Sequence, residues 1–140
     1  MKKALALITI ALAFFAGTAF QSQNEVVAQS LKVYELRTYT TARGPLPALL
    51  NRFGGGEIDL SIKHGMTSVG YWVPDSEELS QNTMVYMVAL ESREAAVQSW
   101  SAFGNDPVWH TMRDQSREDG PVVTRVVTPF LDLTSFSPGQ

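Results

Sequence analysis

Two predicted strands of this chain are apolar on both faces, and this pattern constrains the fold most. In the segment 84–90, one face carries Met84, Tyr86 and Val88, and the other carries Val85, Met87 and Ala89. In the segment 122–131, the two faces carry Val122, Val126 and Phe130, and Val123, Val127 and Leu131. A sheet with one face in water should alternate apolar with polar residues instead. Both faces of this sheet therefore need cover.

The predicted elements follow the order β-α-β-β-α-β. Strands are expected at 32–40, 66–73, 84–90 and 122–131, where β-branched and aromatic residues lie between turn signals. Helical spacing of apolar residues fills the first and third intervals between them. Two helical crossovers around a central hairpin make the ferredoxin-like arrangement. The predicted class is α+β, an antiparallel sheet with its helices on one face.

The first predicted helix begins at the proline-rich segment 45–47 and ends at His64 and Gly65. Its inward side is expected to carry Leu46, Leu49, Leu50, Phe53 and Leu60. A glycine triplet, 54–56, lies inside it, and each helical glycine costs about 1 kcal/mol relative to alanine. We expect the triplet to kink or interrupt this helix.

The second predicted helix is split in two. Ser92 is its expected N-cap, and Asp106 caps a restart whose first residue is Pro107. The inward side of both parts is expected to carry Ala96, Trp100, Phe103, Val108, Trp109 and Met112.

Two helices cover only one face of a sheet, and a chain of 140 residues has no further strands to cover the other. A second copy of the chain can cover that face through a symmetric sheet-on-sheet contact. We therefore predict a homodimer.

The first 19 residues have the composition of a signal peptide. Lys2 and Lys3 precede an apolar run, 4–16, and the small residues of 17–19 predict cleavage after Ala19. The alternative is a retained membrane anchor, for which the run is shorter than the roughly 20 residues a bilayer needs. We expect a periplasmic or secreted protein without stable membrane insertion after cleavage, consisting of a flexible lead-in at 20–31 and one domain at 32–138.

Composition excludes several classes of function. A net charge of −3 offers no basic face, so no nucleic-acid partner is expected. The chain has no cysteine, which excludes disulfides, thiolate metal sites and a cysteine nucleophile. The histidines and carboxylates lack metal-ligand spacing, so we expect neither a metal site nor a cofactor.

Five short phrases of this sequence, taken together and in order, resemble the NIPSNAP family. They are YELRTYT at 34–40, KHGM at 63–66, GYW at 70–72, NDPVW at 105–109 and SFSP at 135–138. The resemblance covers residues 32–138 and implies a fold similar to the dimeric α+β barrel. That superfamily includes cofactor-independent monooxygenases, isomerases and haem-binding enzymes, but a shared fold does not transfer function. The glycine triplet departs from the family pattern, in which longer polar or charged residues are usual.

Charged residues on the first strand give the first candidate site. Glu35 and Arg37 share a face with Tyr39, and a charge on a buried face requires a partner. Because the fourth strand should lie beside the first, we expect Arg125 to reach Glu35. One interpretation is a paired network that holds the register. The other makes Arg37 the anchor of an acidic or carbonyl ligand, with Tyr39 beside it.

The two histidines, His64 and His110, are candidate general bases. A helix-terminal position explains His64 without catalysis, so His110 and Arg37 are the catalytic candidates. The candidate ligand-binding set is Arg37, Tyr39, Tyr71, Trp109 and His110, because aromatic residues between sheet and helices suit a flat apolar ligand.

Three functions remain open from the sequence. The preferred one is a non-catalytic, dimeric domain that binds a small apolar or aromatic ligand. The alternative is a cofactor-independent monooxygenase or isomerase, and the third is a structural dimer without a ligand. No combination of nucleophile, base and orienting group is visible, which favours binding.

Overall fold

The computed structural model describes residues 32–138, and its elements follow the predicted order. They are β1 (Val33–Thr41), α2 (Leu46–Arg52), the π-helix η1 (Phe53–Glu57), α3 (Ile58–Lys63), β2 (Thr67–Trp72), β3 (Thr83–Leu90), α4 (Arg93–Asn105), α5 (Pro107–Gln115), β4 (Val123–Val127) and β5 (Phe130–Leu131). The body of the protein is the compact unit Val33–Asp132. Residues 133–138 belong to a second unit, in which the Ser137 amide donates to the Thr134 carbonyl at 2.9 Å. The predicted signal peptide and the lead-in at 20–31 lie outside the described residues.

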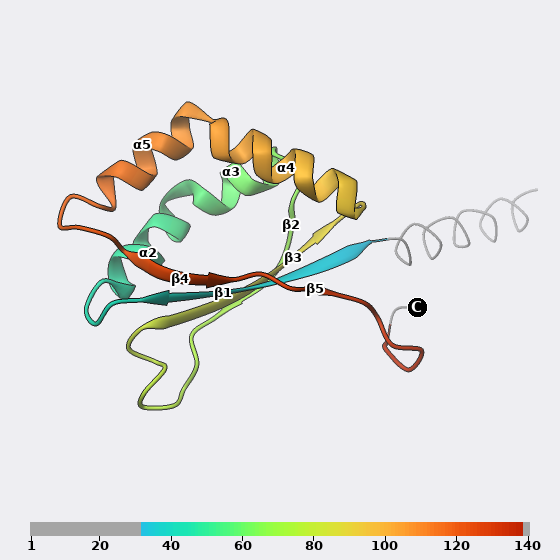
Figure 1. Cartoon of the computed structure of the whole chain (residues 1–140), viewed down its shortest axis with the longest axis horizontal. Helices are drawn as coiled ribbons and strands as arrows, with labels where there is room; N and C mark the ends of the chain where they lie inside the picture. The colour runs from blue at the N-terminus through green and yellow to red at the C-terminus, as the bar shows by residue number, and fades with distance from the viewer. Residues whose placement is uncertain (1–31, 139–140) are drawn as a thin grey trace, which may run out of the picture. The chain divides into compact units, whose positions relative to one another are not determined.

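The sheet is antiparallel, with strand order β2-β3-β1-β4, and β5 pairs with the start of β1 (Figure 1). This order confirms the ferredoxin-like prediction. The predicted last strand is divided in two, because Thr128 and Pro129 interrupt it and proline has no N–H for the ladder. The carbonyl of Pro129 still accepts from the Leu36 amide at 3.0 Å, which keeps β5 beside β1.

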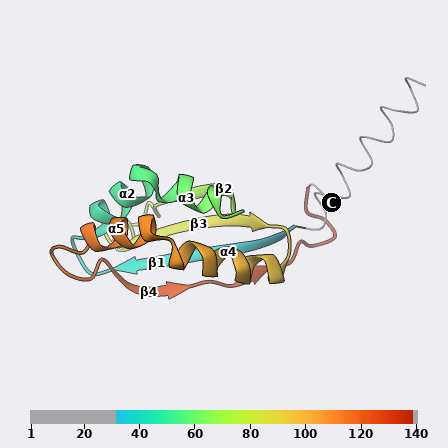
Figure 2. The ribbon, with the colours of Figure 1, turned by 90° about the horizontal axis from the view of Figure 1, so that it is seen from above.

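All helices of the body lie on one face of the sheet, which we call the inner face (Figure 1, Figure 2). Strand β3 turns Met84, Tyr86, Val88 and Leu90 toward the helices, and all four are buried. From the helices, the core receives Leu46, Leu49, Phe53, Leu60, Ala96 and Phe103. The core is therefore a single layer between sheet and helices.

The glycine triplet interrupts the first helix, as predicted. Residues 53–57 form a π-helical turn in which Gly56 has a φ of 130°, a conformation that residues with a Cβ rarely adopt. Leu50 is 38% exposed, so its predicted inward position is wrong. The buried stripe of the short helix α2 runs through Leu46, Leu49 and Phe53, at spacings of three and four, and Leu50 lies on its flank.

Both predicted caps of the second helix are present. The Ala95 amide donates to Ser92 Oγ at 3.0 Å, and the Val108 amide donates to Asp106 Oδ1 at 2.9 Å. Val108 itself is 50% exposed, contrary to prediction. The covered side of α5 carries Trp109 and Met112, three residues apart, and Val108 is turned about 100° from Trp109 around the helix axis.

The other face of the sheet, which we call the outer face, is covered by none of the helices of the body (Figure 1). Directly paired residues of an antiparallel sheet share a face. The register assigns to the outer face the apolar residues Leu36, Trp72, Val85, Met87, Ala89, Val127 and Leu131, together with Tyr34, Thr38, Thr40, Thr67, Thr83 and Arg125. Trp72 is 51% exposed, and its ring lies over Gly70, where an added Cβ would meet it at 2.5 Å. The outer face therefore carries an apolar cluster on β1, β2 and β3, beside threonines and Arg125.

Among residues 32–138, none of the helices is long and apolar enough to cross a membrane.

Candidate functional site

A cleft of about 560 Å³ lies on the inner face, between β1 and α4. Glu35, Arg37 and Tyr39 line one side of it, because alternate residues of a strand share a face. Helix α4 lines the opposite side with Ala96, Val97, Trp100, Phe103 and Gly104, and Trp109, Thr128 and Phe130 complete the lining. The walls are therefore aromatic, and the charged groups come from β1.

Glu35 connects the sheet to helix α4. One carboxylate oxygen, Oε2, accepts from Trp100 Nε1 at 2.5 Å, and the other, Oε1, pairs with Arg37 Nη1 at 2.5 Å. The Glu35 side chain is only 5% exposed. A buried carboxylate needs such donors, and here each of its oxygens has one.

Arg37 is surrounded by aromatic rings. Its guanidinium carbon lies 3.9 Å from the centroid of the Trp100 ring, a close cation–π contact, and Nη2 donates to Tyr39 Oη at 3.3 Å. Burial alone would lower the pKa of Arg37, but the neighbouring tyrosines and Glu35 outweigh it and raise the pKa above its usual value. The nitrogen Nε is buried and has no acceptor among the described residues.

Two tyrosine hydroxyls meet at the edge of this network. Tyr86 Oη donates to Tyr39 Oη at 3.0 Å, and the two rings form an edge-to-face pair. Burial raises the pKa of Tyr86 well above its usual value, and the neighbouring Tyr39 raises it further. Tyr86 therefore remains a neutral hydrogen-bond donor.

Three of the five predicted ligand-binding residues, Arg37, Tyr39 and Trp109, line this cleft. Tyr71 lies outside the lining: its ring stacks on Tyr86 at 5.6 Å, and its hydroxyl bonds Ser68 at 2.7 Å. His110 is exposed and also lies outside the lining.

The predicted ion pair between Arg125 and Glu35 is wrong. Arg125 pairs with Thr40 in the register of β1 and β4, five residues from Glu35, which is about 17 Å along a strand. Glu35 instead pairs with Arg37 on its own strand.

Sequence reasoning missed the role of Trp100 as a partner of Glu35. The signal for its position was present, because Ala96, Trp100 and Phe103 have the spacing of one helix face. No local pattern indicated that Trp100 bonds Glu35, because 65 residues separate the two in the sequence.

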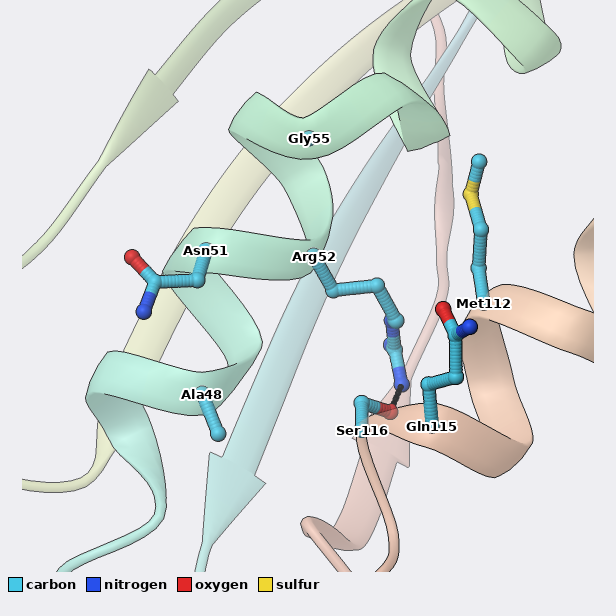
Figure 3. A pocket seen from close by; sticks show the side chains of 7 residues that line it. All are labelled: Ala48, Asn51, Arg52, Gly55, Met112, Gln115 and Ser116. Carbon is cyan, nitrogen blue, oxygen red and sulfur yellow. Dashed lines mark hydrogen bonds between the residues drawn. The ribbon is translucent and has the colours of Figure 1, made fainter.

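A second cleft, of about 360 Å³, lies between α2 and α5 (Figure 3). At its wall, Arg52 Nη1 donates to Ser116 Oγ at 3.1 Å, and Nε donates to Glu57 Oε2 at 2.6 Å. Burial raises the pKa of Glu57, although its pairing with Arg52 opposes the shift. Because the charge of Arg52 is balanced by Glu57, this cleft offers no free cation to a ligand.

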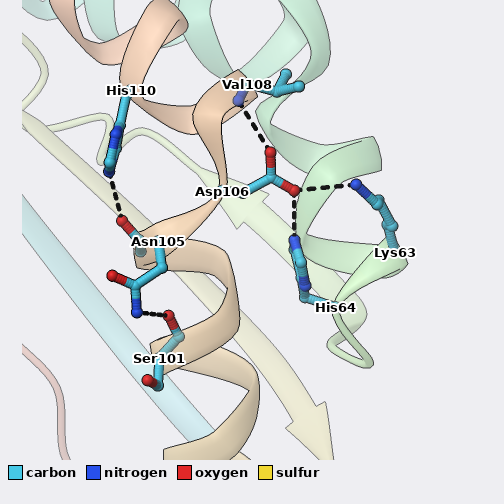
Figure 4. Close-up of polar contacts among 8 residues, drawn as sticks. Lys63, His64, Ser101, Asn105, Asp106, Val108 and His110 are labelled. Atoms are coloured by element: carbon cyan, nitrogen blue, oxygen red, sulfur yellow. Dashed lines mark hydrogen bonds and ion pairs between the residues drawn. The ribbon is translucent and has the colours of Figure 1, made fainter.

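His64 belongs to a polar junction between α3 and α5 (Figure 4). Its Nε2 lies 2.8 Å from Asp106 Oδ2, which also accepts from Lys63 Nζ at 2.9 Å. Lys63, followed by the Val108 amide and His64, holds the pKa of Asp106 well below its usual range. His110 bonds the Gly104 carbonyl at 2.9 Å. Both histidines therefore have structural partners.

Within the described part of the chain, no three His, Asp or Glu side chains come close enough to hold a metal ion.

Comparisons with known proteins agree on one family. The NIPSNAP family model matches residues 34–138. A NIPSNAP-like domain protein from Burkholderia xenovorans superposes with a TM-score of 0.67 at 20% identity, covering 78% of this chain and 90% of that one. A NIPSNAP family protein from Agrobacterium tumefaciens str. C58 superposes with a TM-score of 0.66 at 24% identity, covering 79% and 96%.

A more distant structure shares the fold alone. SnoaB, a cofactor-independent oxygenase from Streptomyces nogalater, superposes with a TM-score of 0.50 at 10% identity, covering 76% of this chain and 97% of that one. No curated protein matches this chain.

Proposed function

The chain belongs to the NIPSNAP family, and from that premise we propose that it binds a small, flat, largely apolar ligand in the cleft between β1 and α4. The observation that carries this proposal is the cleft itself. Its aromatic walls, Trp100, Phe103, Trp109 and Phe130, surround one polar end formed by Glu35, Arg37 and Tyr39. Apolar walls with a few convergent polar groups are typical of small-molecule sites.

The geometry supports binding better than catalysis. A monooxygenase or isomerase needs a base within reach of its substrate, and neither His64 nor His110 lines the cleft. Glu35 lines it, but both carboxylate oxygens are already bonded. The likeness to SnoaB supports a common fold and no shared reaction.

Filling the cleft tests this proposal. Gly104 lines it, and a Cβ built there meets nothing within 4 Å, so Gly104→Leu should occupy the space without a clash. Gly54→Leu is the matched control, because Gly54 has equal space but lies outside the lining. With 2-acetylnaphthalene as the probe, we expect calorimetry to detect binding to the wild type and to Gly54→Leu, and no binding to Gly104→Leu. Equal binding by both variants, or none by the wild type, would contradict the proposal.

We also propose that the outer face pairs with a second copy of the chain. Trp72, Val127 and Leu131 are 51%, 40% and 36% exposed in the single chain, and no helix of the body reaches them. A symmetric sheet-on-sheet contact would remove this apolar surface from water.

Export remains a proposal from the N-terminal sequence. The basic residues at 2–3 and the apolar run at 4–16 support a cleaved signal peptide. Intact mass measurement of the protein from its own host should give a chain that begins at Phe20, and a mass that retains residues 1–19 would contradict this.

A further inference from the structure

The hydroxyl group of Tyr39 has an incomplete set of hydrogen bonds. A phenol oxygen can accept two hydrogen bonds and donate one. Tyr39 Oη accepts from Tyr86 Oη at 3.0 Å and from Arg37 Nη2 at 3.3 Å. The proton of Tyr39 therefore remains to be donated, and Tyr39 lines the cleft.

Burial fixes the direction of the bond between the two tyrosines. Tyr86 is only 3% exposed, and in the described part of the chain Tyr39 Oη is the hydrogen-bond partner of its hydroxyl. If Tyr39 donated instead, the Tyr86 proton would be buried without an acceptor, which folded proteins avoid. Tyr86 therefore donates, and Tyr39 can direct its own proton into the cleft.

The polar end of the cleft has more donors than acceptors and no net charge. Arg37 retains a buried Nε–H without an acceptor among the described residues, while its charge is balanced by Glu35. An uncharged oxygen acceptor on the ligand would accept the Tyr39 proton without adding charge to this end of the cleft. A carboxylate would bring an unbalanced charge against aromatic walls, at a cost in desolvation.

We infer that Tyr39 donates a hydrogen bond to an uncharged carbonyl oxygen of the bound ligand, so that the cleft selects aromatic carbonyl compounds over the corresponding hydrocarbons. This inference rests on the proposed function and adds the chemical class of its ligand. Arg37 assists, because a donor bonded to the Tyr39 oxygen polarises the O–H group and strengthens the bond that it makes.

Two probes of similar shape test the inference: 2-acetylnaphthalene, which has a carbonyl oxygen, and 2-ethylnaphthalene, which has none. We expect the wild type to bind the ketone more tightly, by on the order of 10-fold, the value of one buried hydrogen bond. Tyr39→Phe should remove this preference, so that the ketone and the hydrocarbon bind the variant with similar affinity. Tyr71→Phe is the control, because the Tyr71 hydroxyl bonds Ser68 and lies outside the lining.

The possible results distinguish the inference about Tyr39 from the proposal that the cleft binds a ligand. A ketone preference that persists in Tyr39→Phe would overturn the inference and leave ligand binding intact. Tighter binding of 2-naphthoate than of the ketone would overturn the assignment of an uncharged carbonyl. If the wild type binds neither naphthalene probe, the proposed function fails, and this inference fails with it.

Folding of the variant needs its own control, because Tyr39→Phe leaves the Tyr86 proton without its acceptor. If circular dichroism shows that the single variant is unfolded, the double variant Tyr39→Phe, Tyr86→Phe removes both hydroxyls. The same loss of preference is expected there, and a retained preference would overturn the inference.

Discussion

Glu35 connects two of the elements that line the cleft. Its two oxygens bind Arg37 on the same strand and Trp100 on α4, so one carboxylate joins the sheet to a helix. A buried ion pair contributes little net stability relative to an apolar pair, but loss of one partner is costly. The polar end of the cleft is therefore sensitive to any change at Glu35.

We predict that Glu35→Gln lowers the free energy of unfolding by about 3 kcal/mol, because it leaves the Arg37 charge buried without its partner. Urea denaturation measures the loss. Asp114→Asn is the control, since Asp114 pairs with Arg113 on the surface, where an ion pair contributes less than about 1 kcal/mol. Similar small losses of stability in both variants would show that the buried charge of Arg37 does not need Glu35 as its partner.

At the scale of elements, the glycine triplet sets the path of the first helical segment. Gly54 has helical dihedral angles, and a Cβ added there would meet nothing within 4 Å. Gly56 has a φ of 130°, and a Cβ added there would lie 3.1 Å from Met112 Cε. Gly54 and Gly56 therefore differ in how well they can tolerate a side chain. Within the triplet, Gly56 is the residue whose positive φ favours glycine.

Substitution by alanine should therefore have opposite effects within the triplet. We expect Gly56→Ala to destabilise the protein by about 1–2 kcal/mol, the cost of a left-handed conformation for a residue with a Cβ. Gly54→Ala should stabilise it by up to about 1 kcal/mol through helix propensity. Thermal and urea denaturation of the two variants check this, and changes of the same sign would contradict the role assigned to Gly56.

Asp106 makes the junction of α3 and α5 sensitive to acid. Its pKa lies below the unfolded value of about 3.9, so the ionised carboxylate stabilises the native state above that pH. This stabilisation is lost as the pH falls further, toward the lowered pKa of the folded state. Asp106→Asn retains a capping side chain but has no charge to lose. We expect the stability difference between wild type and variant to shrink between about pH 4 and pH 2. A difference that stays constant from pH 7 to pH 2 would contradict this account.

The elements could be predicted from the sequence, but most of their side-chain contacts could not. Periodicity and capping residues such as Ser92 and Asp106 are local signals, and they located the strands, the split helix and the face shared by Arg37 and Tyr39. The pairing of Arg125 was mispredicted because the sequence does not fix the register between the first and last strands. The bond between Trp100 and Glu35 depends on how α4 packs over the sheet, which no local pattern specifies.

For the whole molecule, the two apolar faces of the sheet imply different partners. The inner face is covered by the chain's own helices and contains the cleft. The outer face carries an apolar cluster that spans three adjacent strands, with Leu36 opposite Met87 and Trp72 opposite Val85. Burial of that surface would provide the main driving force for pairing of two copies.

We predict that light scattering at micromolar concentration gives a dimer mass for the wild type and a monomer mass for Met87→Lys. A lysine at this position would place a charge in the proposed interface, while in the single chain its flexible stem can still reach water. Ile62→Lys is the control, because Ile62 is 52% exposed on α3, away from the outer face. A monomer mass for the wild type would contradict the proposal that a second copy covers the outer face.

The three tryptophans allow the most direct test of ligand binding in the cleft. Trp100 and Trp109 line the cleft, whereas Trp72 lies on the outer face, and each indole N–H gives its own signal in a ¹H–¹⁵N spectrum, assigned with Trp→Phe variants. On titration with 2-acetylnaphthalene, we predict that the signals of Trp100 and Trp109 shift with a common affinity while that of Trp72 does not. A shift of Trp72 alone, or of no indole signal, would contradict the proposed site.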